Sequence, residues 1–284
     1  MALNPTQLNR VDLYVKTIFK KAMSEDFTDH AAGLYTVTPN RTGVARILNL
    51  TSVPGMRRWL SERRPGTFKF QTEMKKVGKW EQSVAINGED VEDDELGIYK
   101  SAIEEMALEN KLMYGVLAAE AINKGFVTSM GDGKKFFSTD HGNLQTGALT
   151  GENFDKACLK LEMQRDDKGR SYGYLATTLI VGPSNKAAAR AVVKKEYLAG
   201  GESNPNFDAV KIVVIPQITD TSWYVADLSR SMKPVEIIER RKIGALRQIM
   251  KDRQDDADIY TWGTDGRFDA AYSKYRLIVG STGA

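Results

Sequence analysis

Cysteine and histidine are scarce in this sequence of 284 residues, which contains one cysteine, Cys158, and two histidines, His30 and His141. A single cysteine cannot form a disulfide within the chain, and a zinc site built from several cysteines needs more thiolates than the chain has. Histidine-dependent catalysis is also hard to assemble from two imidazoles. These absences exclude a disulfide-stabilised scaffold and a cysteine zinc finger.

The sequence also lacks a large net charge and a long hydrophobic run. It has 40 basic and 37 acidic residues, a net charge of +3, which argues against a dedicated nucleic-acid coat. No run approaches the roughly 18 apolar residues of a membrane span, and the N-terminus lacks the apolar core of a secretory signal. We therefore expect a soluble protein made in the cytosol, with no membrane partner.

A helix is predicted near the N-terminus, over residues 4–23. Asn4 is a favourable N-cap residue, and Pro5 suits the first helical position. One face of this helix is apolar and consists of Leu8, Val11, Val15, Ile18, Phe19 and Ala22. The helix either packs on its own domain or forms an arm on a neighbouring subunit, and the sequence leaves both alternatives open.

The region after this helix is predicted to be rich in β-structure. Residues 34–50 favour extended chain, and a short helix is expected over 56–62. Residues 67–87 contain two runs of alternating apolar and polar residues on either side of Gly78, and this pattern predicts a β-hairpin. The longest helix is expected over 95–125.

The rest of the chain alternates between helical and strand patterns. Two further helices are expected, over 152–165 and 184–197. Short apolar runs are typical of buried strands, and the predicted strands cover 175–181, 210–215, 223–228, 235–238, 255–262 and 267–280. A β-rich arm, a long helix and a central α/β unit together indicate the α+β class.

Charge is arranged in two opposite blocks, although the total is near zero. Residues 41–85 contain ten basic and three acidic side chains, a net charge of +7, whereas residues 86–109 contain one basic and nine acidic side chains, a net charge of −8. Complementary patches guide association and register more than isolated ion pairs do. The blocks are either two solvated faces of one domain or, in our hypothesis, surfaces through which one copy binds another.

The predicted hairpin also carries apolar side chains that a projecting hairpin cannot bury alone, namely Phe68, Phe70, Met74 and Trp80. We therefore expect the hairpin to lie on a neighbouring copy. The candidate intersubunit contacts are the basic and aromatic residues of the hairpin region and the acidic residues that follow it: Arg57, Arg58, Trp59, Arg63, Arg64, Phe68, Phe70, Trp80, Glu92, Asp93, Asp94 and Glu95.

Catalytic and ligand-binding motifs are not supported. Residues 131–135 (GDGKK) lack the spacer and the hydroxyl residue of a phosphate-binding loop, and residues 90–101 lack the glycine and the final glutamate of a calcium loop. Asp140 and His141 are the one pair from which an acid–base site could be built, and an enzyme using them is kept as an alternative. We expect no catalytic residue, cofactor or metal site.

Several segments, taken in order, resemble the major head (capsid) proteins of Mu-like tailed phages. These segments are 54–60 (PGMRRWL), 91–99 (VEDDELGIY), 136–142 (FFSTDHG), 223–230 (WYVADLSR), 260–267 (YTWGTDGR) and 276–280 (RLIVG). Each segment alone is weakly specific, but their order and spacing extend the resemblance from about residue 34 to the end of the chain.

The resemblance implies the tailed-phage major capsid fold of the Hong Kong 97 type. Its parts correspond to an N-terminal arm, an extended β-hairpin loop, a peripheral domain with a long spine helix, and an axial α/β domain. In this sequence the arm covers 1–40, the loop 41–90, the peripheral domain 91–171 with return strands in 233–284, and the axial domain 172–232.

The resemblance further implies a structural protein of the virion. Such proteins assemble in the host cytoplasm into hexamers and pentamers, which form an icosahedral shell around double-stranded DNA. The expected partners are copies of the same chain, portal and scaffold proteins, possible decoration proteins, and packaged DNA in non-specific contact. A cellular nanocompartment of the same fold, which encloses a protein cargo, is the alternative within this class.

Overall fold

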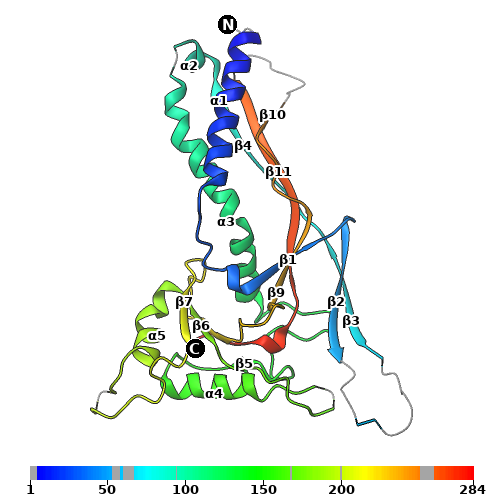
Figure 1. Ribbon diagram of the computed structural model, residues 1–284, viewed down its shortest axis with the longest axis vertical. Helices are drawn as coiled ribbons and strands as arrows, with labels where there is room; N and C mark the ends of the chain where they lie inside the picture. Colours follow the sequence, from blue (N-terminus) through cyan, green and yellow to red (C-terminus); the bar gives the residue numbers. More distant parts are fainter. Residues whose placement is uncertain are drawn as a thin grey trace.

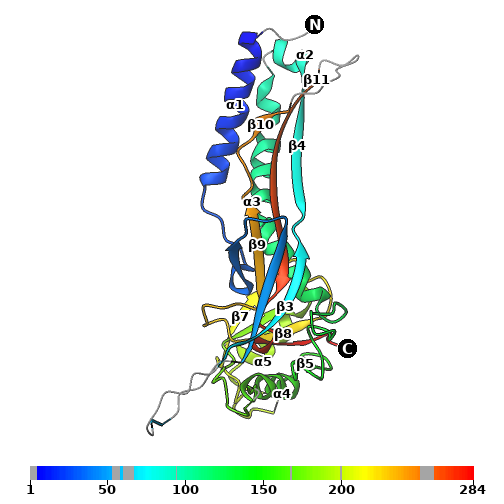
Figure 2. The ribbon, with the colours of Figure 1, turned by 90° about the vertical axis from the view of Figure 1, so that its right-hand side faces the viewer.

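The computed structural model describes residues 5–52, 58–59, 67–93, 95–166, 168–198, 200–249 and 259–284, and it is elongated (Figure 1). Long helices and strands run together along its upper half. A more compact lower half holds a second sheet and two shorter helices, and a two-stranded loop projects beside it (Figure 2). The α+β class predicted from the sequence is confirmed.

The upper half is built from two long helices on a sheet. Helix α1 (Pro5–Ser24) packs against α3 (Lys100–Lys124), and a short helix, α2 (Gly88–Glu92), lies at the upper end near the start of α3 (Figure 1). The apolar face of α1 is buried in one cluster with residues of α3 and of the sheet, among them Val11, Val15, Phe19, Ile103 and Trp262. Of the two alternatives for this helix, packing on its own chain is therefore the one observed.

The sheet of the upper half is organised around one long strand, β11 (Ile259–Tyr272). Its first part pairs with β4 (Lys79–Asn87) and β10 (Arg247–Gln248), and its second part with β9 (Val235–Arg241), all antiparallel. Strand β1 (Tyr35–Pro39) lies parallel to β9 at the edge. This sheet thus joins β1, β4 and the consecutive strands β9, β10 and β11, which come from three separate parts of the sequence.

The lower half contains a second five-stranded sheet in the order β5-β12-β8-β6-β7. These strands are Leu144–Gln145, Ile278–Ser281, Trp223–Ala226, Thr178–Val181 and Lys211–Val214. One face is covered by α4 (Gly151–Glu162) and α5 (Lys186–Val193), and the other by the end of α3. Strands β6 and β8 are buried on both faces, which explains why they read as continuous apolar runs.

The predicted hairpin over 67–87 is wrong in its pairing. Both strands exist, but β3 (Lys69–Lys76) pairs with β2 (Val44–Ser52), whereas β4 pairs with β11. Val77, between β3 and β4, is buried, and there the chain passes from the projecting sheet into the sheet of the body. Alternation within a strand reports which side chains share a face, and it carries no information about the partner strand.

The end of the chain also differs from expectation. Residues 267–272 continue β11 without a break, and a 3-10 turn over Tyr275–Leu277 stands where alternation suggested a strand. Glycines inside β11 permit close packing, because a Cβ atom at Gly263 would lie 2.5 Å from Ile249 and one at Gly266 would lie 2.6 Å from Phe268. The helix expected over 56–62 and part of the strand over 255–262 lie outside the described residues.

Because α1 is held by its own chain, a core substitution in it should weaken the unassembled subunit. Phe19 is 3% exposed and Leu13, on the opposite face, is 69% exposed. We expect Phe19→Ala to lower the free energy of unfolding by about 3–5 kcal/mol and Leu13→Ala to change it by less than about 0.5 kcal/mol. Urea denaturation of the dispersed subunit measures both, and equal effects would mean that α1 does not pack as described.

Candidate intersubunit surface

The two-stranded sheet formed by β2 and β3, which we call the extended loop, is attached to the body through one face. Ala45 and Ile47 of β2 are buried in a small cluster with Val77, Ile238 and Ala271. Antiparallel register places alternate residues of both strands on the same side, so this buried side is the inner face of the loop.

The outer face of the extended loop exposes large apolar side chains. The exposed fractions are 46% for Val44, 53% for Phe70 and 63% for Met74, and Phe68 just before β3 is 59% exposed. The rings of Phe68 and Phe70 lie 6.2 Å apart. Neighbouring exposed apolar residues mark interaction surfaces, and complete burial of each such side chain stabilises by about 1.5–3 kcal/mol. The loop therefore presents a surface suited to another protein.

Polar contacts hold the base of the extended loop in place. The Lys75 ammonium lies 3.3 Å from the Asp269 carboxylate and also donates a hydrogen bond to the carbonyl of Ala270. The turn at Gly131 packs against β3, since a Cβ atom at this glycine would lie 3.2 Å from the Cβ of Glu73. These contacts fix the direction in which the loop leaves the body.

Trp80 is less available for a partner than the sequence suggested. Its indole stacks on Phe268 of the same chain at 6.1 Å and an interplanar angle of 13°, and its Nε1 donates a hydrogen bond to the Phe268 carbonyl at 2.9 Å. The side chain is still 38% exposed. Trp80 therefore has a structural role within the body, and an intersubunit contact through its exposed edge stays a prediction.

The acidic candidates lie far from the extended loop of the same copy. Glu92, Asp93 and Glu95 are exposed around α2 at the upper end of the molecule, whereas the loop projects beside the lower half (Figure 1). Asn87 is the N-cap of helix α2, and its side chain accepts a hydrogen bond from the amide of Glu89. Carboxylates in the first turn of a helix are favoured by its dipole.

The tip of the extended loop is described at two residues only. Arg58 and Trp59 are exposed, and Trp59 has 63% of its surface accessible. The other predicted contacts, Arg57, Arg63, Arg64 and Asp94, lie outside the described residues. Within one copy the described basic and acidic candidates do not meet, which is the arrangement that contact between copies requires.

The acid–base pair of the enzyme alternative does not form. His141 is bonded through Nε2 to the Asp132 carboxylate at 2.8 Å and through Nδ1 to the Phe136 carbonyl at 3.1 Å. The Asp140 side chain is 62% exposed and lies 3.7 Å from the Lys134 ammonium. Both ring nitrogens of His141 therefore serve the local fold, and their hydrogen bonds to Asp132 and Phe136 make its buried position possible.

Among the described residues, no group of three or more histidine, cysteine, aspartate and glutamate side chains is placed to hold a metal ion. Within the same part of the chain, no helix has both the length and the apolarity needed to cross a membrane.

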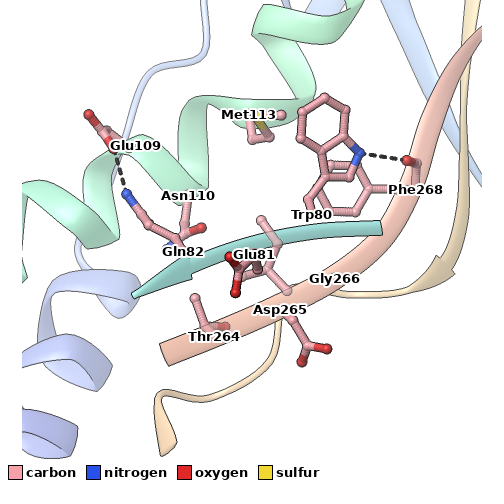
Figure 3. A pocket seen from close by; sticks show the side chains of 11 residues that line it. Trp80, Glu81, Gln82, Glu109, Asn110, Met113, Thr264, Asp265, Gly266 and Phe268 are labelled. Atoms are coloured by element: carbon pink, nitrogen blue, oxygen red, sulfur yellow. Dashed lines mark hydrogen bonds between the residues drawn. The ribbon is translucent and has the colours of Figure 1, made fainter. Parts of the chain in front are cut away.

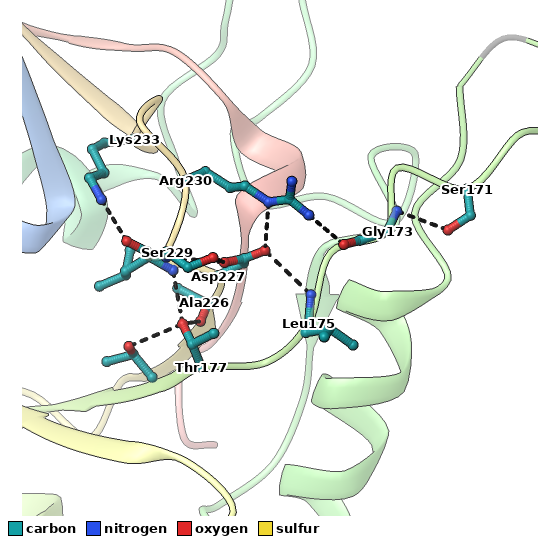
Figure 4. Close-up of polar contacts among 11 residues, drawn as sticks. Ser171, Gly173, Leu175, Thr177, Ala226, Asp227, Ser229, Arg230 and Lys233 are labelled. Atoms are coloured by element: carbon teal, nitrogen blue, oxygen red, sulfur yellow. Dashed lines mark hydrogen bonds and ion pairs between the residues drawn. The ribbon is translucent and has the colours of Figure 1, made fainter.

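A buried carboxylate that the sequence did not single out, Asp227, joins loops of the lower half (Figure 4). It accepts hydrogen bonds from the backbone and hydroxyl of Ser229 at 3.1 and 2.5 Å, from the amide of Leu175 at 3.3 Å and from the Arg230 guanidinium at 3.2 Å. Arg230 also donates to the Gly173 carbonyl at 2.5 Å. The network ties the end of β8 to the chain entering β6.

The environment of Asp227 determines its ionisation. Burial alone opposes the charged form, but the hydrogen bonds from Ser229, Arg230 and Leu175 outweigh it and hold the pKa of Asp227 below its ordinary value. The only sequence signal for this residue is its position inside segment 223–230, one of those that carry the family resemblance.

A lowered pKa makes the contribution of Asp227 dependent on pH. Its stabilisation is present above the ordinary aspartate pKa of about 4 and is lost as the pH falls through the lower pKa of the folded state. We expect Asp227→Asn to reduce the free energy of unfolding by about 1–3 kcal/mol at neutral pH and by progressively less in acid. Denaturant titrations at several pH values measure this, with the exposed Asp140→Asn as control; a pH-independent difference would contradict it.

Comparisons with known proteins agree with this geometry. The family model described as the Mu-like prophage major head subunit gpT matches residues 8–148, 143–218 and 217–284, and so nearly the whole chain. A Mu-like prophage FluMu major head subunit from Haemophilus influenzae is 26% identical over 251 residues. That match includes 85% of this chain but 62% of the relative, so the chain spans less than two thirds of the relative's length.

Solved structures show the same fold. The procapsid of bacteriophage JBD30 matches with a TM-score of 0.61 at 19% identity, covering 99% of this chain and 76% of that chain. The holo-SrpI encapsulin of Synechococcus elongatus PCC 7942 matches with a TM-score of 0.55 at 12% identity, covering 88% of this chain and 85% of that chain. These likenesses establish the tailed-phage capsid fold, and the family model establishes that the chain belongs to the Mu-like major head subunit family.

Proposed function

We propose that copies of this chain assemble into the icosahedral head shell of a Mu-like phage, as hexamers and pentamers around double-stranded DNA. The observation that carries the proposal is the extended loop, which exposes an apolar outer face at one end of the molecule while an acidic segment is exposed at the other. Contacts between unlike surfaces, repeated around an axis, close rings and build larger shells. Membership of the head subunit family supports the same conclusion.

The proposal extends to the partners and the location of such a shell. The chain would assemble in the host cytoplasm, become part of the virion, meet portal, scaffold and decoration proteins, and touch packaged DNA without sequence specificity. It would act as a structural protein without catalytic residues. A modest net charge of +3 suits this role, because a strongly basic wall would retain DNA that has to leave.

The division into parts is also a proposal. We assign an arm (1–40), a loop region (41–90) that contains the extended loop, a peripheral domain (91–171 and 233–284) and an axial domain (172–232). Strand pairing disagrees with two of these assignments. Strand β4, assigned to the loop region, pairs with β11 in the sheet of the body, and β12, assigned to the peripheral domain, pairs with β8 in the axial sheet. The pairing of β2 with β3 supports placing the loop itself before Val77.

A cellular nanocompartment is the second candidate, and the fold shared with an encapsulin favours it. The two functions differ in what the shell encloses. Particles purified from cells would contain a co-purifying protein cargo in a nanocompartment and nucleic acid in a phage head. Nuclease-protected DNA and the masses of co-purifying proteins separate the two.

Charge reversal tests the contact between copies. Replacing Arg57, Arg58, Arg63 and Arg64 by Glu should abolish shell formation, because like charges would then face each other, while leaving the subunit folded. Electron microscopy and light scattering measure assembly, and circular dichroism measures folding. Adding Glu92, Asp93, Asp94 and Glu95→Lys to the same chain should restore part of the assembly. Normal shells from the first variant would falsify the charge-based contact.

A further inference from the structure

A cavity of about 160 Å³ opens between α3 and strands β4 and β11 (Figure 3). Its apolar wall consists of Trp80, Phe268 and Met113, with the indole of Trp80 stacked on Phe268. Its polar wall contains Gln82 of β4 and Glu109 of α3, whose side chains are joined by a hydrogen bond (Figure 3). Ligand sites typically combine apolar and aromatic walls with a few polar groups, as this cavity does.

One buried hydrogen-bond acceptor in the wall of this cavity, Oε1 of Gln82, has no donor. The Gln82 amide nitrogen donates to the Glu109 carboxylate at 2.5 Å, and as a consequence the Gln82 Oε1 atom is buried without a hydrogen-bond partner. The Trp80 and Asn110 donors are used by the carbonyls of Phe268 and Met106. An unpartnered buried acceptor costs about 1–3 kcal/mol, and a bound group that brings donors would remove this cost.

An arginine side chain has the chemistry that this cavity lacks. A guanidinium group offers five N–H donors in one plane, is weakly hydrated, and stacks on aromatic rings. It would donate to Gln82 Oε1 and Glu109 while its aliphatic stem lies along Trp80 and Met113. A carboxylate that also lines the cavity, Asp265, already binds guanidinium groups of its own chain, those of Arg241 and Arg247.

We propose that the cavity binds the Arg58 side chain of a second copy of this chain. The inference rests on the proposed function, whose charge-based contact it deepens by naming the residues at one end. Glu109 is the last residue of the acidic window with a net charge of −8, and Arg58 is an exposed member of the basic window with a net charge of +7. Strands β2 and β3 project away from the body of their own copy (Figure 2), and the proposed partner of Arg58 is therefore the cavity of a neighbour.

A charge exchange within one chain tests this pairing. Arg58→Glu and Glu109→Lys should each reduce the fraction of subunits in shells by about tenfold or more, because like charges would meet in a partly desolvated site. The double variant R58E/E109K should recover most of the assembly. The matched control combines Arg58→Glu with Glu105→Lys, which reverses an exposed charge on the same helix outside the cavity and should not recover it.

A second measurement keeps the test independent of shell formation. Arg58→Cys with Glu109→Cys, in a Cys158→Ala background, should form disulfide-linked oligomers on mild oxidation, and Arg58→Cys with Glu105→Cys should form them at least several-fold less. The inference is overturned if R58E/E109K assembles no better than its control, or if both cysteine pairs crosslink equally. Failure of the unaltered chain to form shells would count against the proposed function instead, while selective crosslinking would still support the pairing.

Discussion

Burial of strand β11 is the constraint on which the rest of the structure depends. Near its start Trp262 is enclosed by α1 and α3, and its indole donates a hydrogen bond to Asp12 at 3.0 Å. Near its end Tyr272 stacks on Phe136 at 4.5 Å in the core that reaches the lower sheet. One continuous strand therefore links both halves, and its position decides where α1, β4 and β9 have to lie.

This arrangement buries the apolar side chains of the body but only one face of the extended loop. The inner face of the loop is buried against Ile238 and Ala271, whereas its outer face keeps Phe70 and Met74 in solvent. In the proposed shell, contact with a neighbouring copy would bury these side chains and add to the stability of the assembled subunit.

Local periodicity predicted the individual elements well and their pairing poorly. The apolar face of the N-terminal helix was visible from Val11, Val15 and Phe19, and β6 and β8 were visible as apolar runs. The β2–β3 pairing was not, since the loop tip separates these strands in sequence while β3 and β4 are adjacent. The aromatic candidates differ in exposure because β3 and β4 belong to different sheets. Phe68 and Phe70, in or beside β3, are exposed, whereas Trp80 of β4 stacks on Phe268.

The sequence by itself determined the α+β class, the helices, the family resemblance and the separation of charge into two blocks, because each of these is written in residue types at short spacing. Only the tertiary structure decided that α1 lies on its own chain, that Asp227 links two loops and that Gln82 donates a hydrogen bond to Glu109 in the wall of a cavity. These features join residues far apart along the chain. Their proximity follows from how the sheets pair, and single-sequence patterns carry no such long-range information.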